Sequence, residues 1–134
     1  MRAIFGLVAA LLLALPVAAE EPADSIQAVI ADQIAAFGRA DVEAAYAHAS
    51  PVIQRKFGSA GRFGQMVEGG YPMIWRPSTW RMLELEDRSG SLFQTVLFAD
   101  QAGELYEADY EMIEIDGIWR INGVMVRKLP TQSS

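Results

Sequence analysis

The chain has 134 residues, and its 11 Lys and Arg against 17 Asp and Glu give a formal net charge of −6. Such an acidic excess repels phosphate backbones, so we expect no nucleic-acid partner. The chain has no cysteine and one histidine, which excludes disulfides, thiol catalysis, zinc–thiolate sites and multi-histidine metal sites. With no phosphate-binding or metal motif in the sequence either, we expect neither a metal ion nor a cofactor.

The first 19 residues predict a secretory signal peptide. Arg2 supplies the positive charge, residues 4–15 are apolar apart from Gly6, and small residues follow Pro16 up to Ala19. The apolar run is shorter than the roughly 20 residues of a membrane-spanning helix, and a lipoprotein would need a cysteine at the cut. We expect cleavage after Ala19, leaving one domain, residues 20–134, that is periplasmic or secreted and has no membrane contact. A retained anchor is the alternative.

The first helix predicted in this domain has a narrow apolar stripe. Asp24 or Ser25 can cap its start, and Gly38 is a natural stop. Its apolar residues recur at helical spacing: Ile26, Val29, Ile30, Ile34 and Phe37.

Two more helices follow in the same half of the chain. Asp41 caps the second, which must end near Ser50 because a residue before proline avoids helical geometry. Residues 52–57 predict a further helical turn, closed by Gly58. Ser59 caps the third helix, and the pair of glycines at 69–70 stops it.

The pattern changes after these glycines. Residues 71–77, with Pro72 and Pro77, predict an extended or irregular crossing segment. Four strand-like runs separated by turn residues come next: 78–86, 91–99, 104–115 and 118–128. Their short connections predict an antiparallel meander.

The last hairpin can be interpreted in register. Asp116 and Gly117 form a strong two-residue turn signal that sets Ile115 opposite Ile118. Pairing in step places Tyr110 opposite Gly123. It also predicts one apolar face, which holds Tyr106, Ala108, Tyr110, Met112, Trp119, Ile121, Gly123 and Met125. The other face holds Glu107, Asp109, Glu111, Arg120 and Asn122 and is expected to be solvated. Residues 91–99 are apolar on both faces, which indicates a central strand or a face used in self-association.

Helices followed by a meander predict an α+β fold, with three N-terminal helices packed on one face of a curved four-stranded antiparallel sheet. The stretch IADQIAAFGRADVEAAYAHASPVIQRKFGSAGRFGQMVEGGYPMIWRP resembles the bacterial family called domain of unknown function 4864. The order of elements and the ending DGIWRINGVMV resemble the wider NTF2-like (SnoaL-like) superfamily of cone-shaped domains. The resemblance implies a deep cavity between the helices and the concave sheet face. It transfers no catalytic residue, because the family has no established activity. In related folds such a cavity binds small apolar ligands or hosts isomerase and dehydratase chemistry.

Large rings are the first candidates for lining such a cavity, although rings also simply fill cores. The candidates are Tyr46, Tyr71, Trp75, Trp80, Tyr110 and Trp119. Two polar side chains join them. His48 is either a helix C-terminal cap, a surface residue or a catalytic base. Arg76 is either a surface residue or a group that recognises a carboxylate or stacks on a ring.

Three functional hypotheses remain open at this point. The first is an exported domain that binds a small apolar ligand or a protein partner without catalysis. The second is an isomerase- or dehydratase-like enzyme that uses Tyr46, Tyr71 or His48. The third is a homodimeric structural module that associates through the outer sheet face.

Overall fold

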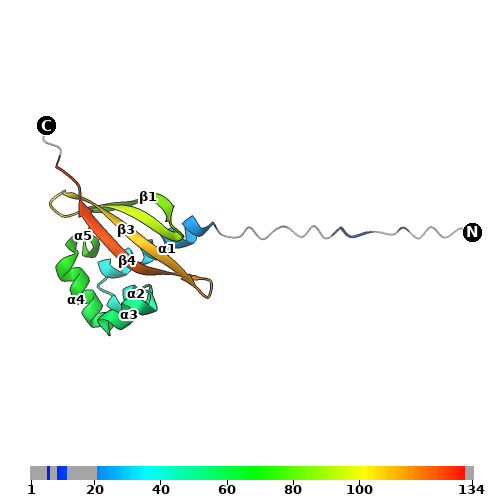
Figure 1. Ribbon diagram of the computed structural model, residues 1–134, viewed down its shortest axis with the longest axis horizontal. Helices are drawn as coiled ribbons and strands as arrows, with labels where there is room; N and C mark the ends of the chain where they lie inside the picture. Colours follow the sequence, from blue (N-terminus) through cyan, green and yellow to red (C-terminus); the bar gives the residue numbers. More distant parts are fainter. Residues whose placement is uncertain (1–5, 7–8, 12–20, 132–134) are drawn as a thin grey trace, which may run out of the picture.

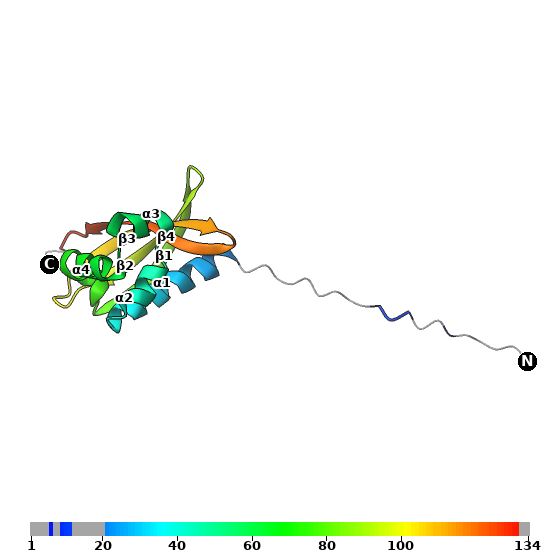
Figure 2. The same ribbon diagram turned by 90° about the horizontal axis from the view of Figure 1, so that it is seen from below.

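The computed structural model of the chain describes residues 6, 9–11 and 21–131. The expected cleavage point after Ala19 lies outside these residues. Within them the helices precede the strands, and Figures 1 and 2 show the helices gathered on one face of the sheet. This is the α+β arrangement that the sequence predicts. No helix in the described part of the chain is long and apolar enough to cross a membrane.

The first two helices start in different ways. α1 (Pro22–Gly38) begins with a proline in its first turn, where a missing N–H costs nothing. The predicted cap at Asp24 or Ser25 is therefore wrong, because both residues lie inside α1. α2 (Val42–Ala47) is capped as predicted, with the Asp41 carboxylate accepting a hydrogen bond from the Ala44 N–H at 3.1 Å.

Serine caps and a glycine order the next two helices. Ser50 caps α3 (Pro51–Phe57) and Ser59 caps α4 (Ala60–Gly70) through their hydroxyls. Gly58 ends α3 in the left-handed region at φ 80°, a conformation that glycine adopts without strain. The predicted helical turn and third helix are confirmed.

The segment after α4 is more ordered than predicted. Residues 71–77 contain the single-turn helix α5 (Pro72–Trp75), so the expectation of an extended or irregular segment is wrong there. Pro72 occupies the first turn, and the Ile74 and Trp75 N–H groups donate to the Tyr71 carbonyl at 2.9 Å. The proline that suggested a break instead starts a helix.

The sheet consists of β1 (Thr79–Arg88), β2 (Ser91–Ala99), β3 (Leu105–Ile115) and β4 (Ile118–Lys128), paired antiparallel in chain order. The meander is confirmed. The two-residue turn at Asp116 and Gly117 has positive φ at both positions, 52° and 78°, as a type I′ hairpin requires. It sets Ile115 opposite Ile118.

The register of β3 and β4 shifts by one residue between Glu111 and Met112, because Asn122 is an extra residue in β4. Tyr110 therefore lies opposite Val124, and the prediction that paired it with Gly123 is wrong. Beyond the bulge the alternation of β4 reverses, so Met125 is 64% exposed instead of facing the helices.

Backbone bonds on the open edge of β4 accompany the bulge. The Ile121 N–H donates to the His48 carbonyl, and the Ile121 carbonyl accepts from the Ser50 N–H, both at 2.8 Å. The Ser50 hydroxyl also donates to Asn122 Oδ1 at 2.7 Å. The connection between α2 and α3 is thereby fastened to β4, and α1 and α3 also contact this strand.

The sequence predicts a solvated outer sheet face, but this face is only partly exposed. Asp109 is only 4% exposed there. Its carboxylate accepts hydrogen bonds from Arg127 at 2.9 Å, Arg88 at 3.1 Å and Thr95 at 2.8 Å. The cluster joins all four strands across one face. The expectation of solvent exposure is wrong for Asp109, because arginines from both edge strands cover it.

Candidate functional site

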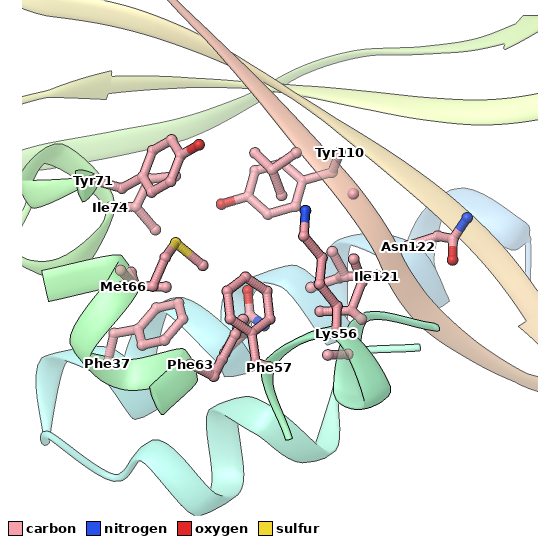
Figure 3. Close-up of a pocket in the computed structure, with 16 residues that line it drawn as sticks. Phe37, Lys56, Phe57, Phe63, Met66, Tyr71, Ile74, Tyr110, Ile121 and Asn122 are labelled. Carbon is pink, nitrogen blue, oxygen red and sulfur yellow. The ribbon is translucent and has the colours of Figure 1, made fainter. Parts of the chain in front are cut away.

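A cavity of about 550 Å³ lies between the helices and the inner face of the sheet (Figure 3). Every helix except α2 contributes to its wall, as do β3 and β4. The lining residues are Gln33, Phe37, Ala49, Ile53, Lys56, Phe57, Phe63, Met66, Val67, Tyr71, Ile74, Tyr110, Ile121, Asn122, Gly123 and Val124. The volume is in the range of sites for small organic molecules.

Aromatic rings form the helical wall. The ring of Phe63 lies 5.9 Å from that of Phe37 and 5.7 Å from that of Phe57, centroid to centroid, and the last pair packs edge to face. Phe37 and Phe63 are buried, so these rings are held by the core behind them. The wall offers a preformed apolar surface to an occupant.

Tyr110 on β3 is the main polar group of the cavity. Its side chain is fully buried, yet among the described residues its hydroxyl is the one buried side-chain polar atom without a hydrogen-bond partner. Figure 3 shows this hydroxyl pointing into the cavity. Burial raises the pKa of the Tyr110 phenol well above its ordinary value, so the group stays protonated and can donate a hydrogen bond.

Lys56 brings the one charged side chain among the described residues that line the cavity. It lies on the last turn of α3, and Figure 3 shows it reaching from α3 towards Tyr110. Its ammonium lies 5.7 Å from the centre of the Phe57 ring, and it forms no ion pair within the described part of the chain. The half-buried Tyr71 adds a second phenol beside the cavity (Figure 3).

The other two polar lining residues are engaged within the protein. Gln33 is buried and donates from Nε2 to the Ala45 carbonyl at 3.1 Å, which ties α1 to α2. Asn122 accepts from Ser50 through Oδ1, as described above. The side chains of Tyr110, Tyr71 and Lys56 can each donate a hydrogen bond to an occupant.

The structure places the six ring candidates in different surroundings. Tyr71 and Tyr110 line the cavity. Tyr46 and Trp75 lie one layer behind it, where Tyr46 packs 5.5 Å from Phe63 and Trp75 packs 5.7 Å from Phe37. The Tyr46 hydroxyl donates to the Gln54 carbonyl.

The two remaining tryptophans lie on the edge strands and are not among the lining residues. Trp80 is 38% exposed on β1, opposite Phe98. Trp119 lies near the β3–β4 turn, partly buried against the core. Sequence alone could not separate these six rings, because depth depends on which layer of the fold each one reaches.

The two polar candidates also lie outside the lining. His48 ends α2, and its Nε2 is 2.9 Å from Asp32 Oδ2 on α1. Arg76 lies over the Trp75 ring at 5.3 Å and donates to the Phe37 carbonyl at 2.7 Å. Arg76 thus makes the ring stacking that its neighbour suggested, and both side chains connect elements of the fold.

Sequence reasoning missed Lys56, Gln33 and Asn122. The periodicity of residues 52–57 predicts only a helical turn, and a lysine near its end has the pattern of an ordinary surface residue. The buried amide of Gln33 interrupts an otherwise apolar stripe, which is a usable signal. Asn122 gives none, because its position follows from the bulge.

The described lining of the cavity combines an apolar wall with a few hydrogen-bond donors. No group of three or more His, Asp or Glu side chains among the described residues could hold a metal ion. The described residues that line the cavity include no carboxylate and no imidazole. An apolar chamber with hydrogen-bond donors can hold and orient a molecule that carries acceptors.

The comparisons with known proteins agree with this fold. A family model described as Domain of unknown function (DUF4864) matches residues 19–134. The structure is similar to that of an NTF-2-like protein of unknown function from Silicibacter pomeroyi DSS-3, with a TM-score of 0.55 and 18% sequence identity. The similarity covers 80% of this chain and 95% of that one. At this identity it shows the fold alone. No curated protein matches the chain.

Proposed function

This chain belongs to the DUF4864 family, and from that premise we propose that its cavity binds a small, largely apolar molecule that accepts a hydrogen bond from Tyr110. The observation that carries the proposal is the buried Tyr110 hydroxyl, which points into the cavity without a partner. A buried donor left unsatisfied costs about 1–3 kcal/mol. An occupant with an acceptor atom would remove this cost while filling the aromatic chamber.

A neutral fluorescent probe, N-phenyl-1-naphthylamine, tests the binding. We expect saturable fluorescence enhancement with the purified protein, and competition by apolar molecules that carry a carbonyl or hydroxyl oxygen. Tyr110→Phe should weaken the oxygen-bearing competitors about three- to tenfold, the range of one hydrogen bond. It should leave a pure hydrocarbon competitor unchanged.

Tyr106→Phe is the matched control. Tyr106 lies on the same strand, but its hydroxyl faces Asp100 and Glu104 at 3.4 Å and does not line the cavity. Equal losses in the two variants would contradict the role of Tyr110. A probe that does not bind at all would contradict the binding function itself.

An isomerase- or dehydratase-like activity is the alternative, and the cavity supports it less. General acid–base catalysis needs a group that exchanges protons near working pH within reach of the substrate. Of the three residues that the hypothesis names, Tyr71 alone lines the cavity, while Tyr46 and His48 bind within the protein. Turnover of a carbonyl substrate that is lost in Tyr71→Phe would favour the enzyme.

We also propose that the outer sheet face joins two copies of the chain. Exposed apolar side chains on this face support it: Met125 is 64% exposed, Leu105 43% and Ile113 38%. Light scattering at micromolar concentration should give the mass of a dimer, and Met125→Lys should give a monomer. A monomeric wild type would contradict the proposal.

Export is the third part of the proposed function, and it rests on the sequence of residues 1–19. Expressed with these residues in a Gram-negative host, the protein should be released from the periplasm with Glu20 as its first residue. Leu12→Arg interrupts the apolar run and should leave the chain unprocessed. Intact residues 1–19 in the membrane fraction would contradict cleavage.

A further inference from the structure

The charged side chains that line the cavity indicate the charge of its ligand. The chain is acidic overall, with a net charge of −6. Yet the described residues that line the cavity include one cation, Lys56, and no acidic side chain. Lys56 is exposed to solvent, and a cation without a paired carboxylate beside an apolar chamber favours an occupant with negative charge.

The direction of the hydrogen bonds agrees with that charge. Lys56 is a donor only, and the protonated Tyr110 hydroxyl has a hydrogen without an acceptor. Figure 3 shows Lys56 reaching from α3 towards the ring of Tyr110 on β3 and the Tyr110 hydroxyl pointing from β3 into the cavity, and both residues line it. A carboxylate accepts hydrogen bonds through both of its oxygens, and can therefore take one from each residue.

The other lining residues indicate the chemistry of the rest of the ligand. Away from these donors the wall consists mainly of Phe37, Phe63, Met66, Val67 and Ile74, which offer carbon surface. A dianionic phosphate would meet a single cation here, which leaves half of its charge uncompensated in an acidic protein. A monoanion with an apolar body matches both the single cation and the apolar surface of the lining.

We propose that the ligand is an amphiphilic monocarboxylate, with its carboxylate between Lys56 and Tyr110 and its apolar body against the aromatic wall. This proposal rests on the binding function stated above and names the class of its ligand. It makes Lys56 the residue that selects charge and Tyr110 the residue that completes the hydrogen bonding.

The experiment compares decanoate with 1-decanol as competitors of the neutral probe at pH 7.5, below the critical micelle concentration. Decanoate should bind about fivefold more tightly, the upper end for an ion pair open to solvent. Its affinity should fall as sodium chloride is raised from 0.02 to 0.5 M, values chosen to span roughly a fivefold change in screening length, while that of decanol stays constant.

Lys56→Gln should remove both the preference and the salt dependence. Arg55→Gln is the matched control, since Arg55 is likewise an exposed cation on α3 but does not line the cavity. It should behave as the wild type. Circular dichroism checks that both variants fold, and the salt series on the wild type tests the charge without any substitution.

The possible outcomes separate the two proposals. Probe binding with equal affinity for decanoate and decanol overturns the monocarboxylate and leaves ligand binding standing. Equal effects of the two substitutions on decanoate show a general surface charge and also overturn it. Failure of the probe, decanoate and decanol together to bind removes the binding function, and this proposal with it.

Discussion

At the scale of single residues, Tyr110 and Gln94 show two outcomes for a polar group in the same core. Both side chains are fully buried on the inner sheet face. Gln94 donates from Nε2 to the carbonyls of Leu83, Glu84 and Thr95, at 3.0, 3.3 and 2.9 Å. Two of these carbonyls lie in the irregular part of β1, where the pairing with β2 shifts. Tyr110 has no such partner, so its hydroxyl remains available to a ligand.

This difference predicts the effect of Tyr110→Phe on stability. Removal of the unsatisfied hydroxyl should raise the free energy of unfolding by about 1 kcal/mol, because the desolvation cost of the group disappears. Urea denaturation of the ligand-free protein measures it. Gln94→Leu should instead lower stability by about 1–3 kcal/mol, because the carbonyls around its side-chain amide lose their shared donor. A loss of more than about 1 kcal/mol in Tyr110→Phe would contradict the absence of a partner.

We expect Asp109 to contribute to the pH dependence of the fold. Burial alone would raise the pKa of its carboxyl, but hydrogen bonds from Arg127, Thr95 and Arg88 outweigh burial and lower that pKa below its ordinary value. A carboxyl whose folded pKa is lowered stabilises the fold above its unfolded pKa of about 3.9. That contribution is lost as the pH falls through the lowered folded value.

Asp109→Asn should therefore reduce the free energy of unfolding at pH 7 by about 1–3 kcal/mol. It should also flatten the loss of stability between about pH 5 and pH 2, which urea titrations at several pH values measure. Glu114→Gln, an exposed position on the same strand, should keep the wild-type slope. An unchanged slope in Asp109→Asn would show that other carboxyls govern acid unfolding.

At the scale of elements, the close approach of α4 to α2 depends on Gly64. This glycine is buried, and a Cβ built on it would collide with Val42 Cγ1 and lie 3.0 Å from Val42 Cβ. The branched valine side chain has little rotamer freedom in a helix, so it cannot move aside easily. The aromatic wall provided by Phe63 on α4 thus depends on a small residue beside it.

Gly64→Ala should destabilise the protein by about 1–3 kcal/mol, because overpacking outweighs the better helix propensity of alanine. Thermal unfolding followed by circular dichroism measures the change. Gly61→Ala lies on the same helix with no atom within 4 Å of the new Cβ, and should leave stability unchanged or raise it slightly. The double variant Gly64→Ala, Val42→Ala should recover part of the loss. No loss in the single variant would contradict the tight packing.

At the scale of the whole molecule, the cavity belongs to no single element. Its walls come from helices that precede the sheet in the chain and from the strands β3 and β4. The core that holds these walls runs from Ile26 to Ile121, entirely within the domain expected after cleavage. Residues 20–134 should therefore fold without the segment that precedes them.

Deletion of residues 2–19 tests this independence. The shortened chain should unfold in one cooperative transition and bind the neutral probe with unchanged affinity, because it keeps every core side chain of the described residues. Denaturation followed by tryptophan fluorescence and by circular dichroism should give coincident curves. Transitions that do not coincide, or loss of probe binding, would show that the leading residues contribute to the fold.

The sequence by itself determined the elements that local chemistry governs. The caps at Asp41 and Ser59, the stop at Gly58 and the turn at Asp116 and Gly117 act within a few residues, and all four are present in the structure. Alternating and helical patterns likewise gave the α+β order, and the resemblance in the helical half gave the family. Where a local signal had two meanings, as for Pro72, the prediction was wrong because proline both breaks and begins helices.

Only the tertiary structure decided the site. The bulge at Asn122 reverses the faces of β4, and the same edge strand bonds to the connection between α2 and α3. Asn122 accepts a hydrogen bond there from Ser50, which lies 72 residues away along the chain. The burial of Asp109 needs arginines from both sheet edges, and the unpaired hydroxyl of Tyr110 needs a cavity that separate elements enclose. Such contacts join residues that no local pattern relates, so the residues that line a cavity follow from the packing of the whole fold.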